Sequence, residues 1–418
     1  MEYIKSKDIY LLMRDILKLI NPTLMEHGSR VAYIVYKMLR EENRYEEFEL
    51  ADIVMVATMH DIGAYKTEQT RINDMLQYET RESMAHSIYG HLLFKYLSPV
   101  PELARVIMYH CRDYEKLQNV DYEYKDVAAY INIAEKIDIY SGTMGAQFDS
   151  RMFQKQAGTK LSATGLERFY QCDAKYGILE KLKSGEFKKE LDEIAEYMIF
   201  SNEGKKVFLD MLIYCMGFFK ESMVFDTVTT ICICEELSSR LFLPEHEKEM
   251  IYYAALLHDL GMIGISRDVI TAPRKLRPEE VKHVRTHVAI TEEKLKGKMD
   301  SEVVSIALAH HERGDGSGYP QRLNEKKISL QQGVLQVADA VSALVNKRSY
   351  REAFPKQQVL QFLAEEVKRK RFKESIVRVL ADSYDEIMVR VKEESARILK
   401  MYQVLNMQYQ QVSVKYKI

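Results

Sequence analysis

The sequence has little glycine or proline, with 18 glycines and 8 prolines among its 418 residues. Strict alternation of apolar and polar residues is also rare. Together these shortages argue against a β-sandwich, a β-barrel and a glycine-rich dinucleotide-binding fold. At roughly 150 residues per domain, the length predicts two or three domains.

Paired cysteines and an excess of one charge are absent as well. The five cysteines show no Cys-x-x-Cys spacing, which argues against a disulfide framework and a four-cysteine zinc site and favours a reducing cytosol. The 60 basic residues are balanced by 62 acidic ones, for a net charge of −2. This balance gives no indication of binding to nucleic acid or to an anionic membrane.

The sequence also lacks a long apolar run. The longest apolar stretch, at 207–219, contains Asp210 and falls short of the ~20 residues that span a bilayer. Charged residues interrupt positions 1–20, which therefore lack the apolar core of a signal peptide. We expect a cytoplasmic protein.

Apolar residues instead recur at three- and four-residue spacings, as they do at Ile9, Leu12, Met13 and Ile16. This period is typical of amphipathic helices and continues through most of the chain. We therefore expect an all-α protein. Residues 385–409 contain few helix breakers and are predicted to form one long helix.

The most informative feature is an internal repeat. The tetrapeptide HDIG at 60–63 recurs as HDLG at 258–261, so that the two histidines lie 198 positions apart. Two further histidines follow each tetrapeptide at similar intervals: His86 and His110 in the first copy, His287 and His310 in the second. The segment IAEKID at 133–138 then parallels VADAVS at 337–342. Four landmarks in the same order predict two copies of one helical domain, each built around a metal site.

The adjacent histidine and aspartate at the end of an apolar helix are chemically unusual. Burying an ionised aspartate is unfavourable unless a cation or a hydrogen-bond donor compensates its charge. A metal ion does so well, and a carboxylate can bridge two ions that together activate a water molecule and hold a phosphate during in-line attack. Histidine and carboxylate ligands without thiolate suit iron, manganese or zinc.

The second copy resembles the HD-GYP domain, a subgroup of the HD phosphohydrolases. The resemblance covers about residues 205–365 and rests on HDLG at 258–261, His287, HHERGDGSGYP at 310–320, VADAVSAL at 337–344 and RSYR at 348–351. It implies an all-helical fold, so that, with the repeat and the predicted long helix, we expect two tandem helical bundles of the HD type followed by a long C-terminal helix. It also implies hydrolysis of the bacterial messenger cyclic di-GMP, to pGpG or to GMP, with two bound iron or manganese ions.

The resemblance carries over to individual residues. It implies that the metal ligands include His258, Asp259, His287, His310, His311 and Asp339. Asp259 is expected to bridge the ions and to be the catalytic carboxylate. Tyr319, Arg348 and Arg351 are expected to contact the nucleotide, and guanidinium groups suit this role because they offer forked donors to phosphate oxygens.

The second copy departs from the family pattern at two main positions. Asp226 stands about 32 residues before His258, where the family has a histidine. We expect it to act as a harder ligand that favours manganese, iron or magnesium. Met262 replaces a lysine and cannot stabilise developing negative charge. Ser222 replaces the glutamate of members with three metals, so a third ion is not expected.

The first copy resembles a generic HD domain. Unlike the second copy, it keeps the early histidine ligand but lacks the substrate-facing motif. It retains candidate ligands for one or two ions, namely His27, His60, Asp61, His86, His110 and either Glu135 or Asp138. Tyr-His-Cys-Arg at 109–112 replaces the HHER sequence, no GYP loop follows, and Ala64 stands at the lysine position. We interpret this copy as a decayed regulatory domain, with a second hydrolase site for a different substrate as the alternative.

These patterns predict an N-terminal HD-like domain with a helical linker at 1–200, an HD-GYP domain at 201–372 and a helical extension at 373–418. The leading hypothesis is a metal-dependent phosphodiesterase that opens cyclic di-GMP. One alternative is a catalytically impaired signalling module that binds cyclic dinucleotides, because of Asp226 and Met262. The other is a hydrolase of a different phosphate ester.

An apolar stripe in the last helix comprises Ile387, Val391, Ile398, Tyr402, Leu405 and Tyr409. Such a stripe can pack on its own domain or pair with a second chain as a coiled coil. We expect a homodimer to which this helix contributes, and a signalling protein as a further partner.

Overall fold

The structure is a computed structural model that describes residues 3–67, 84–347 and 352–416. Within these ranges the chain forms helices and three isolated β-bridges, with no extended strand. The predicted all-α class is therefore confirmed. None of the described helices is long and apolar enough to cross a membrane.

The chain divides into two compact units. The N-terminal unit comprises Ile9–Met211 and Gln403–Ile418, and the C-terminal unit comprises Met1–Asp8 and Leu212–Tyr402. The division falls inside three helices, α1 (Ser6–Ile20), α13 (Asn202–Phe219) and α23 (Tyr384–Tyr416).

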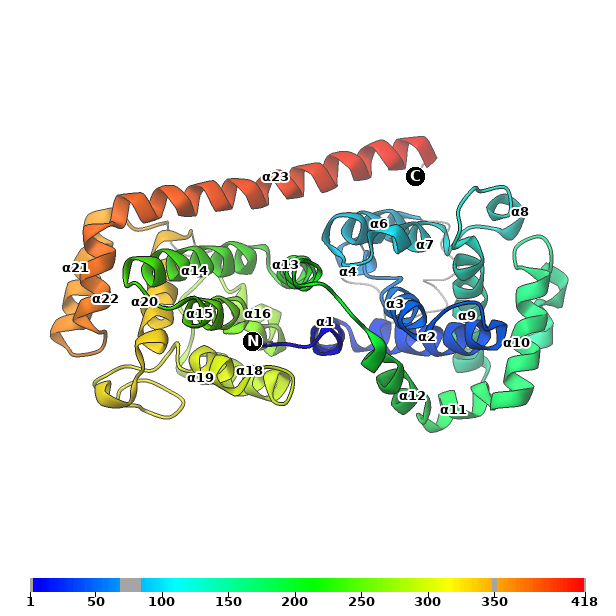
Figure 1. Ribbon diagram of the computed structural model, residues 1–418, viewed down its shortest axis with the longest axis horizontal. Helices are drawn as coiled ribbons and strands as arrows, with labels where there is room; N and C mark the ends of the chain where they lie inside the picture. Colours follow the sequence, from blue (N-terminus) through cyan, green and yellow to red (C-terminus); the bar gives the residue numbers. More distant parts are fainter. Residues whose placement is uncertain (1–2, 68–83, 348–351, 417–418) are drawn as a thin grey trace. The chain divides into compact units, whose positions relative to one another are not determined.

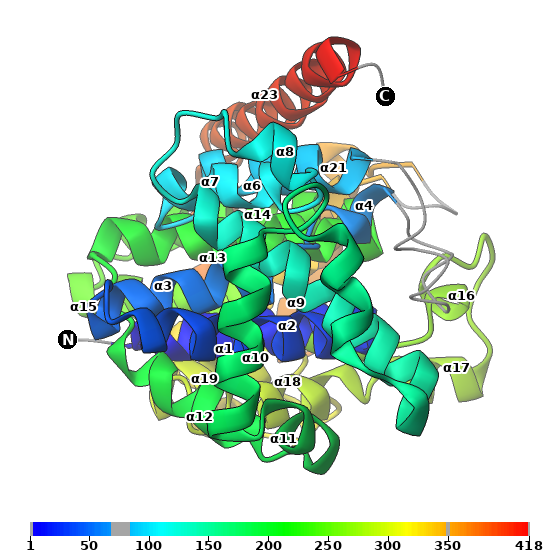
Figure 2. The ribbon, with the colours of Figure 1, turned by 90° about the vertical axis from the view of Figure 1, so that its right-hand side faces the viewer.

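The N-terminal unit is built on α2 (Pro22–Glu42), which packs against α3 (Glu47–Thr58) and α9 (Lys125–Met144) (Figure 1 and Figure 2). The side chain of Asn21 accepts a hydrogen bond from the backbone N–H of Leu24 (3.1 Å) and caps the start of α2. The other helices are α1 (Ser6–Ile20), α4 (Ala64–Thr67), α6 (Ala85–Leu97), α7 (Ala104–Tyr109), α8 (Tyr114–Leu117), α10 (Ala163–Tyr176), α11 (Ile178–Ser184) and α12 (Phe187–Ile194).

The C-terminal unit is built on α14 (Glu221–Arg240), which packs against α15 (Glu245–Leu257) and α20 (Leu330–Val345) (Figure 1). Ser329 and Gln332 form a capping box at the start of α20. The other elements are the 3₁₀ helices η5 (Leu260–Gly264) and η6 (Glu325–Lys327) and the helices α16 (Arg267–Ile270), α17 (Pro278–Val284), α18 (His287–Leu295), α19 (Ser301–Leu308), α21 (Lys356–Lys368) and α22 (Glu374–Asp382).

The two units share one element order around their His-Asp turns. In each, an apolar helix (α3 or α15) ends at the turn, and the glycine of the turn lies against the helix that begins near His86 (α6) or at His287 (α18). A Cβ atom on Gly63 would lie 2.0 Å from the carbonyl oxygen of His86, and one on Gly261 would lie 2.0 Å from that of His287. This approach admits only glycine, which explains why both tetrapeptides keep it.

Helix α23 includes the predicted long helix and extends beyond it at both ends. Ile387, Val391, Ile398 and Leu405 of its apolar stripe are buried. The Tyr402 ring lies 5.0 Å from that of Tyr214, and the Tyr409 ring lies 6.0 Å from that of Tyr89. The stripe therefore packs within the chain.

Candidate metal centres

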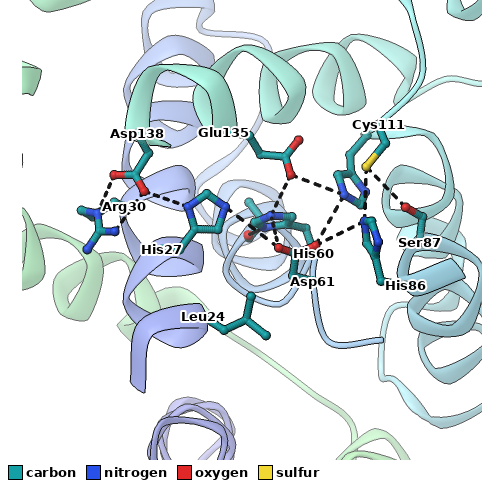
Figure 3. A network of polar contacts seen from close by, with 12 residues as sticks. Leu24, His27, Arg30, His60, Asp61, His86, Ser87, Cys111, Glu135 and Asp138 are labelled. Carbon is teal, nitrogen blue, oxygen red and sulfur yellow. Dashed lines mark hydrogen bonds and ion pairs between the residues drawn. The ribbon is translucent and has the colours of Figure 1, made fainter. Parts of the chain in front are cut away.

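The N-terminal unit gathers its predicted ligands from five elements. His27 lies on α2, His60 and Asp61 follow α3, His86 lies on α6, His110 follows α7, and Glu135 lies on α9. All six residues are buried. Figure 3 shows their side chains converging, and we call this group the N-terminal centre.

Backbone acceptors fix which histidine nitrogens face this centre. The Nδ1 atom of His60 lies 2.7 Å from the carbonyl oxygen of Ala57, and that of His110 lies 2.6 Å from the carbonyl oxygen of Ile107. A carbonyl oxygen can only accept, so Nδ1 carries the proton, and Nε2 of the neutral ring keeps a lone pair. Among the described residues, these two Nε2 atoms and that of His27 find no hydrogen-bond partner. Buried lone pairs of this kind fit a metal ion.

Asp61 lies between two pairs of histidines. Its Oδ2 is 3.4 Å from Nε2 of His60 and 4.0 Å from Nε2 of His27. Its Oδ1 is 3.5 Å from Nε2 of His86 and 3.7 Å from Nε2 of His110. Each carboxylate oxygen therefore faces its own pair of nitrogens, which is the arrangement needed to bridge two ions.

Glu135 and Asp138 take different places. Glu135 Oε1 lies 3.3 Å from Nε2 of His60 and 3.6 Å from Nε2 of His110, so its carboxylate faces the centre. Asp138 lies behind His27, where its Oδ2 is 2.7 Å from Nδ1 of that ring (Figure 3). Arg30 donates to both oxygens of Asp138. Asp138 is thus placed to orient His27, as carboxylates behind metal-bound histidines do.

The buried carboxylates of the N-terminal centre favour the binding of a cation. Burial lowers the pKa of His60, but the Asp61 and Glu135 carboxylates outweigh this effect and raise it to about 10. Burial raises the pKa of Glu135, but His110 and His60 outweigh it and lower the pKa to about 2. Without metal, protonated histidines balance the buried carboxylates, and a divalent ion can take over that role.

The C-terminal unit repeats the arrangement around Asp259, forming what we call the C-terminal centre. Asp259 Oδ1 lies 3.3 Å from Nε2 of His287 and 3.6 Å from Nε2 of His310. Its Oδ2 lies 3.7 Å from Nε2 of His258. Asp339 of α20 lies opposite, with Oδ1 3.8 Å from Nε2 of His258 and Oδ2 3.9 Å from Nδ1 of His311. The structure therefore brings together six of the seven predicted ligands.

Two histidines of this centre place lone pairs face to face. The Nδ1 atoms of His287 and His310 each lie 2.7 Å from a backbone carbonyl oxygen, so both Nε2 atoms are acceptors in the neutral rings. These Nε2 atoms are only 3.2 Å apart. A shared proton or a metal ion is needed to relieve their repulsion. Burial and the neighbouring His258 lower the pKa of His310 to about 4, so its ring is neutral near pH 7 and its Nε2 is available as a metal ligand.

Asp226 stands before its His-Asp turn where His27 stands before the other, but the two side chains have different neighbours. Its Oδ1 accepts a hydrogen bond from the side-chain amide of Asn346 (2.9 Å), and its backbone oxygen accepts one from Ser342 (3.0 Å). The compact group of metal-binding atoms found in this unit consists of Asp259, His287, His310 and His311. The role of Asp226 as a ligand stays a prediction.

The GYP loop lies beside the C-terminal centre. The ring of Tyr319 is 4.7 Å from that of His311, and the guanidinium of Arg285 lies 4.8 Å from the centroid of Tyr319. The buried Glu312 anchors the loop, since its oxygens accept from the backbone N–H groups of Gln321 (2.5 Å) and Leu323 (2.8 Å). Arg348 and Arg351, the predicted phosphate contacts, lie outside the described residues.

Sequence reasoning missed several residues of these surroundings. Arg30, Arg285 and Asn346 stand at no recognised motif position, so no sequence signal indicated them. Cys111 had such a signal, because it follows His110 as His311 follows His310. The sequence comparison alone indicates only that the HHER sequence is absent from the first copy.

Comparison with known families identifies an HD domain in each unit. Residues 24–140 match one HD domain model, and residues 217–376 match a second one.

Curated relatives are phosphodiesterases of cyclic dinucleotides. The chain is 24% identical over 371 residues to 3'3'-cGAMP-specific phosphodiesterase 1 of Vibrio cholerae, a match that covers 82% of this chain and 83% of that protein. It is 38% identical over 130 residues to the cyclic di-GMP phosphodiesterase response regulator RpfG of Xanthomonas campestris, covering 30% of this chain and 34% of that protein. It is 34% identical over 158 residues to 3'3'-cGAMP-specific phosphodiesterase 2 of V. cholerae, where it spans 30% of the relative's length.

A solved structure shares the fold. The crystal structure of a cyclic GMP-AMP specific phosphodiesterase of V. cholerae superposes with a TM-score of 0.59 at 16% identity. The superposition covers 92% of this chain and 98% of that one.

Proposed function

The chain belongs to the HD-GYP-like HD phosphohydrolases and carries two HD domains in tandem, and from this premise we propose that its C-terminal unit is a phosphodiesterase of cyclic di-GMP. The observation that carries the proposal is the bridging position of Asp259, between His258 on one side and His287 with His310 on the other, next to the GYP loop. The product is pGpG or GMP.

The residues of the C-terminal centre have separable roles in this proposal. His258, Asp259, His287, His310, His311 and Asp339 hold two iron or manganese ions. When bound, the ions supply the Lewis acidity that activates water and neutralises the phosphoryl oxygens. Backbone carbonyls behind His258, His287 and His310 keep their Nε2 atoms turned inward, and Glu312 holds the GYP loop in place.

Cyclic GMP-AMP is the second candidate substrate. The relative that matches over most of both chains is named as specific for 3'3'-cGAMP, whereas shorter matches at higher identity include enzymes named for cyclic di-GMP. Both molecules present the same phosphodiester ring to the metal centre and differ in one base.

The test uses the purified full chain loaded with Mn²⁺ or Fe²⁺ and given cyclic di-GMP, 3'3'-cGAMP or a panel of simple phosphate esters, with products separated by chromatography. Linear dinucleotide or mononucleotide from cyclic di-GMP supports the proposal. Product from 3'3'-cGAMP alone selects the second substrate. Stoichiometric binding without product supports a signalling module, and turnover of the simple esters alone indicates another hydrolase.

We predict that Arg285 contacts the phosphate of the substrate. It is exposed, its guanidinium lies over Tyr319, and Met262 leaves the usual lysine position without a charge. A charge-assisted contact contributes about 1.5–3 kcal/mol, so Arg285→Ala is expected to raise KM by roughly ten-fold or more with little change in metal content. The matched control is Arg267→Ala, which removes an exposed arginine of α16. An equal KM in the two variants contradicts this role.

We also keep the homodimer and the signalling partner as predictions. Because the apolar stripe of α23 packs within the chain, a dimer contact through this helix would use its exposed apolar residues, which are Val389, Leu399, Met407 and Val414. Light scattering of the full chain tests the dimer.

A further inference from the structure

Cys111 occupies a ligand position of the N-terminal centre. It follows His110 in the chain, as His311 follows His310 in the C-terminal unit. Its sulfur lies 3.3 Å from Nε2 of His86, and the ligand atoms of His86, His110 and Cys111 all lie within 4.8 Å of one another. Figure 3 shows the sulfur on the same side of Asp61 as His86.

The orientation of His110 is independent evidence for an ion at this place. The side chain of His110 is fully buried, and its Nδ1 donates to the carbonyl oxygen of Ile107. Its Nε2 has no hydrogen-bond partner among the described residues and is 3.7 Å from Asp61 Oδ1. This buried Nε2 atom without a partner thus faces a carboxylate oxygen beside a thiol, and a cation at this place would engage the lone pair of the neutral ring.

The distances fit one ion. Tetrahedral zinc binds nitrogen at about 2.0–2.1 Å and sulfur at about 2.3 Å, which places its ligand atoms about 3.4–3.6 Å apart. The corresponding separations here are 3.3 Å from Cys111 Sγ to His86 Nε2, 3.5 Å from Asp61 Oδ1 to His86 Nε2 and 3.7 Å from Asp61 Oδ1 to His110 Nε2.

A second set of ligands lies on the other side of Asp61. The ligand atoms of His27, His60, Asp61 and Glu135 form a fully buried group. The two groups have no residue in common, and Asp61 turns Oδ2 to the histidines of one and Oδ1 to those of the other. Glu135 Oε1 also faces a histidine of each group, at 3.3 Å from His60 Nε2 and 3.6 Å from His110 Nε2. Both sets therefore have room for their own ion.

We infer that the N-terminal unit holds two metal ions bridged by Asp61, and that the Cys111 thiolate, with His86 and His110, is a ligand of the second. On binding, the thiol releases its proton to solvent. Thiolate is a soft ligand that selects zinc and similar ions, whereas the ligands of the C-terminal centre are imidazole and carboxylate alone. The two units thus load different metals, and the first copy has changed its ligands rather than lost its site.

Cobalt substitution of the full chain tests this inference without any measurement of activity. After removal of metal and refilling with Co²⁺, the wild type should show sulfur-to-cobalt charge-transfer absorption in the near ultraviolet. Cys111→Ser should abolish this absorption and weaken binding of one cobalt equivalent by at least about ten-fold. Cys111→His, which restores the residue type of the second copy, should retain that equivalent without the absorption.

Two controls assign the signal. Cys172→Ala removes a buried thiol of the same unit, and Cys232→Ser removes one from the C-terminal unit, and both should leave the absorption unchanged. Cobalt bound in full without charge-transfer absorption, or absorption that persists in Cys111→Ser, overturns the inference. The result is independent of the proposed hydrolysis, because no predicted ligand of the C-terminal centre is a cysteine.

Discussion

Replacing Asp259 with alanine is expected to release metal from the C-terminal unit and to lower hydrolysis of the cyclic dinucleotide by at least about 10²-fold, the scale on which loss of one transition-state contact acts. The reason is geometric: Asp259 turns Oδ2 to His258 and Oδ1 to His287 and His310. Metal analysis of the purified variant and steady-state assays measure both effects.

Asp61→Ala is the matched control, since it removes the equivalent carboxylate of the N-terminal centre. It should release metal from its own unit and leave most of the hydrolysis intact. Full metal content in Asp259→Ala would contradict the bridging role. If Asp61→Ala loses the activity while Asp259→Ala keeps it, the N-terminal unit is the hydrolase and the proposed function is wrong.

The metal-free protein is expected to lose stability as the pH rises from 6.5 to about 10, and the metal-loaded protein is not. In the folded metal-free chain the carboxylates raise the pKa of His60 from its ordinary 6.5 to about 10. A group with a raised pKa in the folded state contributes stability that is complete below pH 6.5 and is lost as the pH passes through 10. The slope is about 1.4 kcal/mol per pH unit, so the total is at most about 5 kcal/mol.

Bound metal removes this dependence, because it engages the neutral imidazole and balances the carboxylates itself. Glu135 acts in the opposite direction: its pKa is lowered to about 2, so its contribution is present above pH 4.5 and is lost as the pH falls through 2. Scanning calorimetry with and without EDTA over this pH range measures both effects. His60→Gln should flatten the alkaline loss in EDTA, and an equally steep loss in that variant would refute the assignment.

The sequence was sufficient for the all-α class and for the positions of most candidate ligands. Metal ligands come from few residue types at spacings that the repeat makes visible twice, so His60, Asp61 and their counterparts could be named without coordinates. The boundaries of the three predicted domains and the ligand roles themselves stay predictions.

Other features needed three-dimensional information. Glu135 and Asp138 are three residues apart on one helix, so they share a face, and helical periodicity alone does not tell which carboxylate reaches the histidines. The repeat favours Glu135, because 133–138 aligned with 337–342 places it opposite Asp339. The structure separates them because Arg30 of α2 holds Asp138 behind His27. Arg285 reaches Tyr319 from another element, and no local pattern in the sequence relates the two residues.

The glycine that ends each His-Asp tetrapeptide has a consequence for how the two copies could diverge. Gly63 and Gly261 bring the turn against the backbone of His86 and His287, so the position of each aspartate relative to the next histidine is set by direct backbone contact. The same contact occurs in both copies, although the connecting segments differ in length. The interval from the histidine of the tetrapeptide to the next predicted ligand histidine is 26 positions in the first copy and 29 in the second. Even so, the distance from the aspartate Oδ1 to Nε2 of that histidine is nearly the same, 3.5 Å for His86 and 3.3 Å for His287. Insertions between these landmarks are predicted to be tolerated, and a preformed centre binds its ions with little loss of chain entropy.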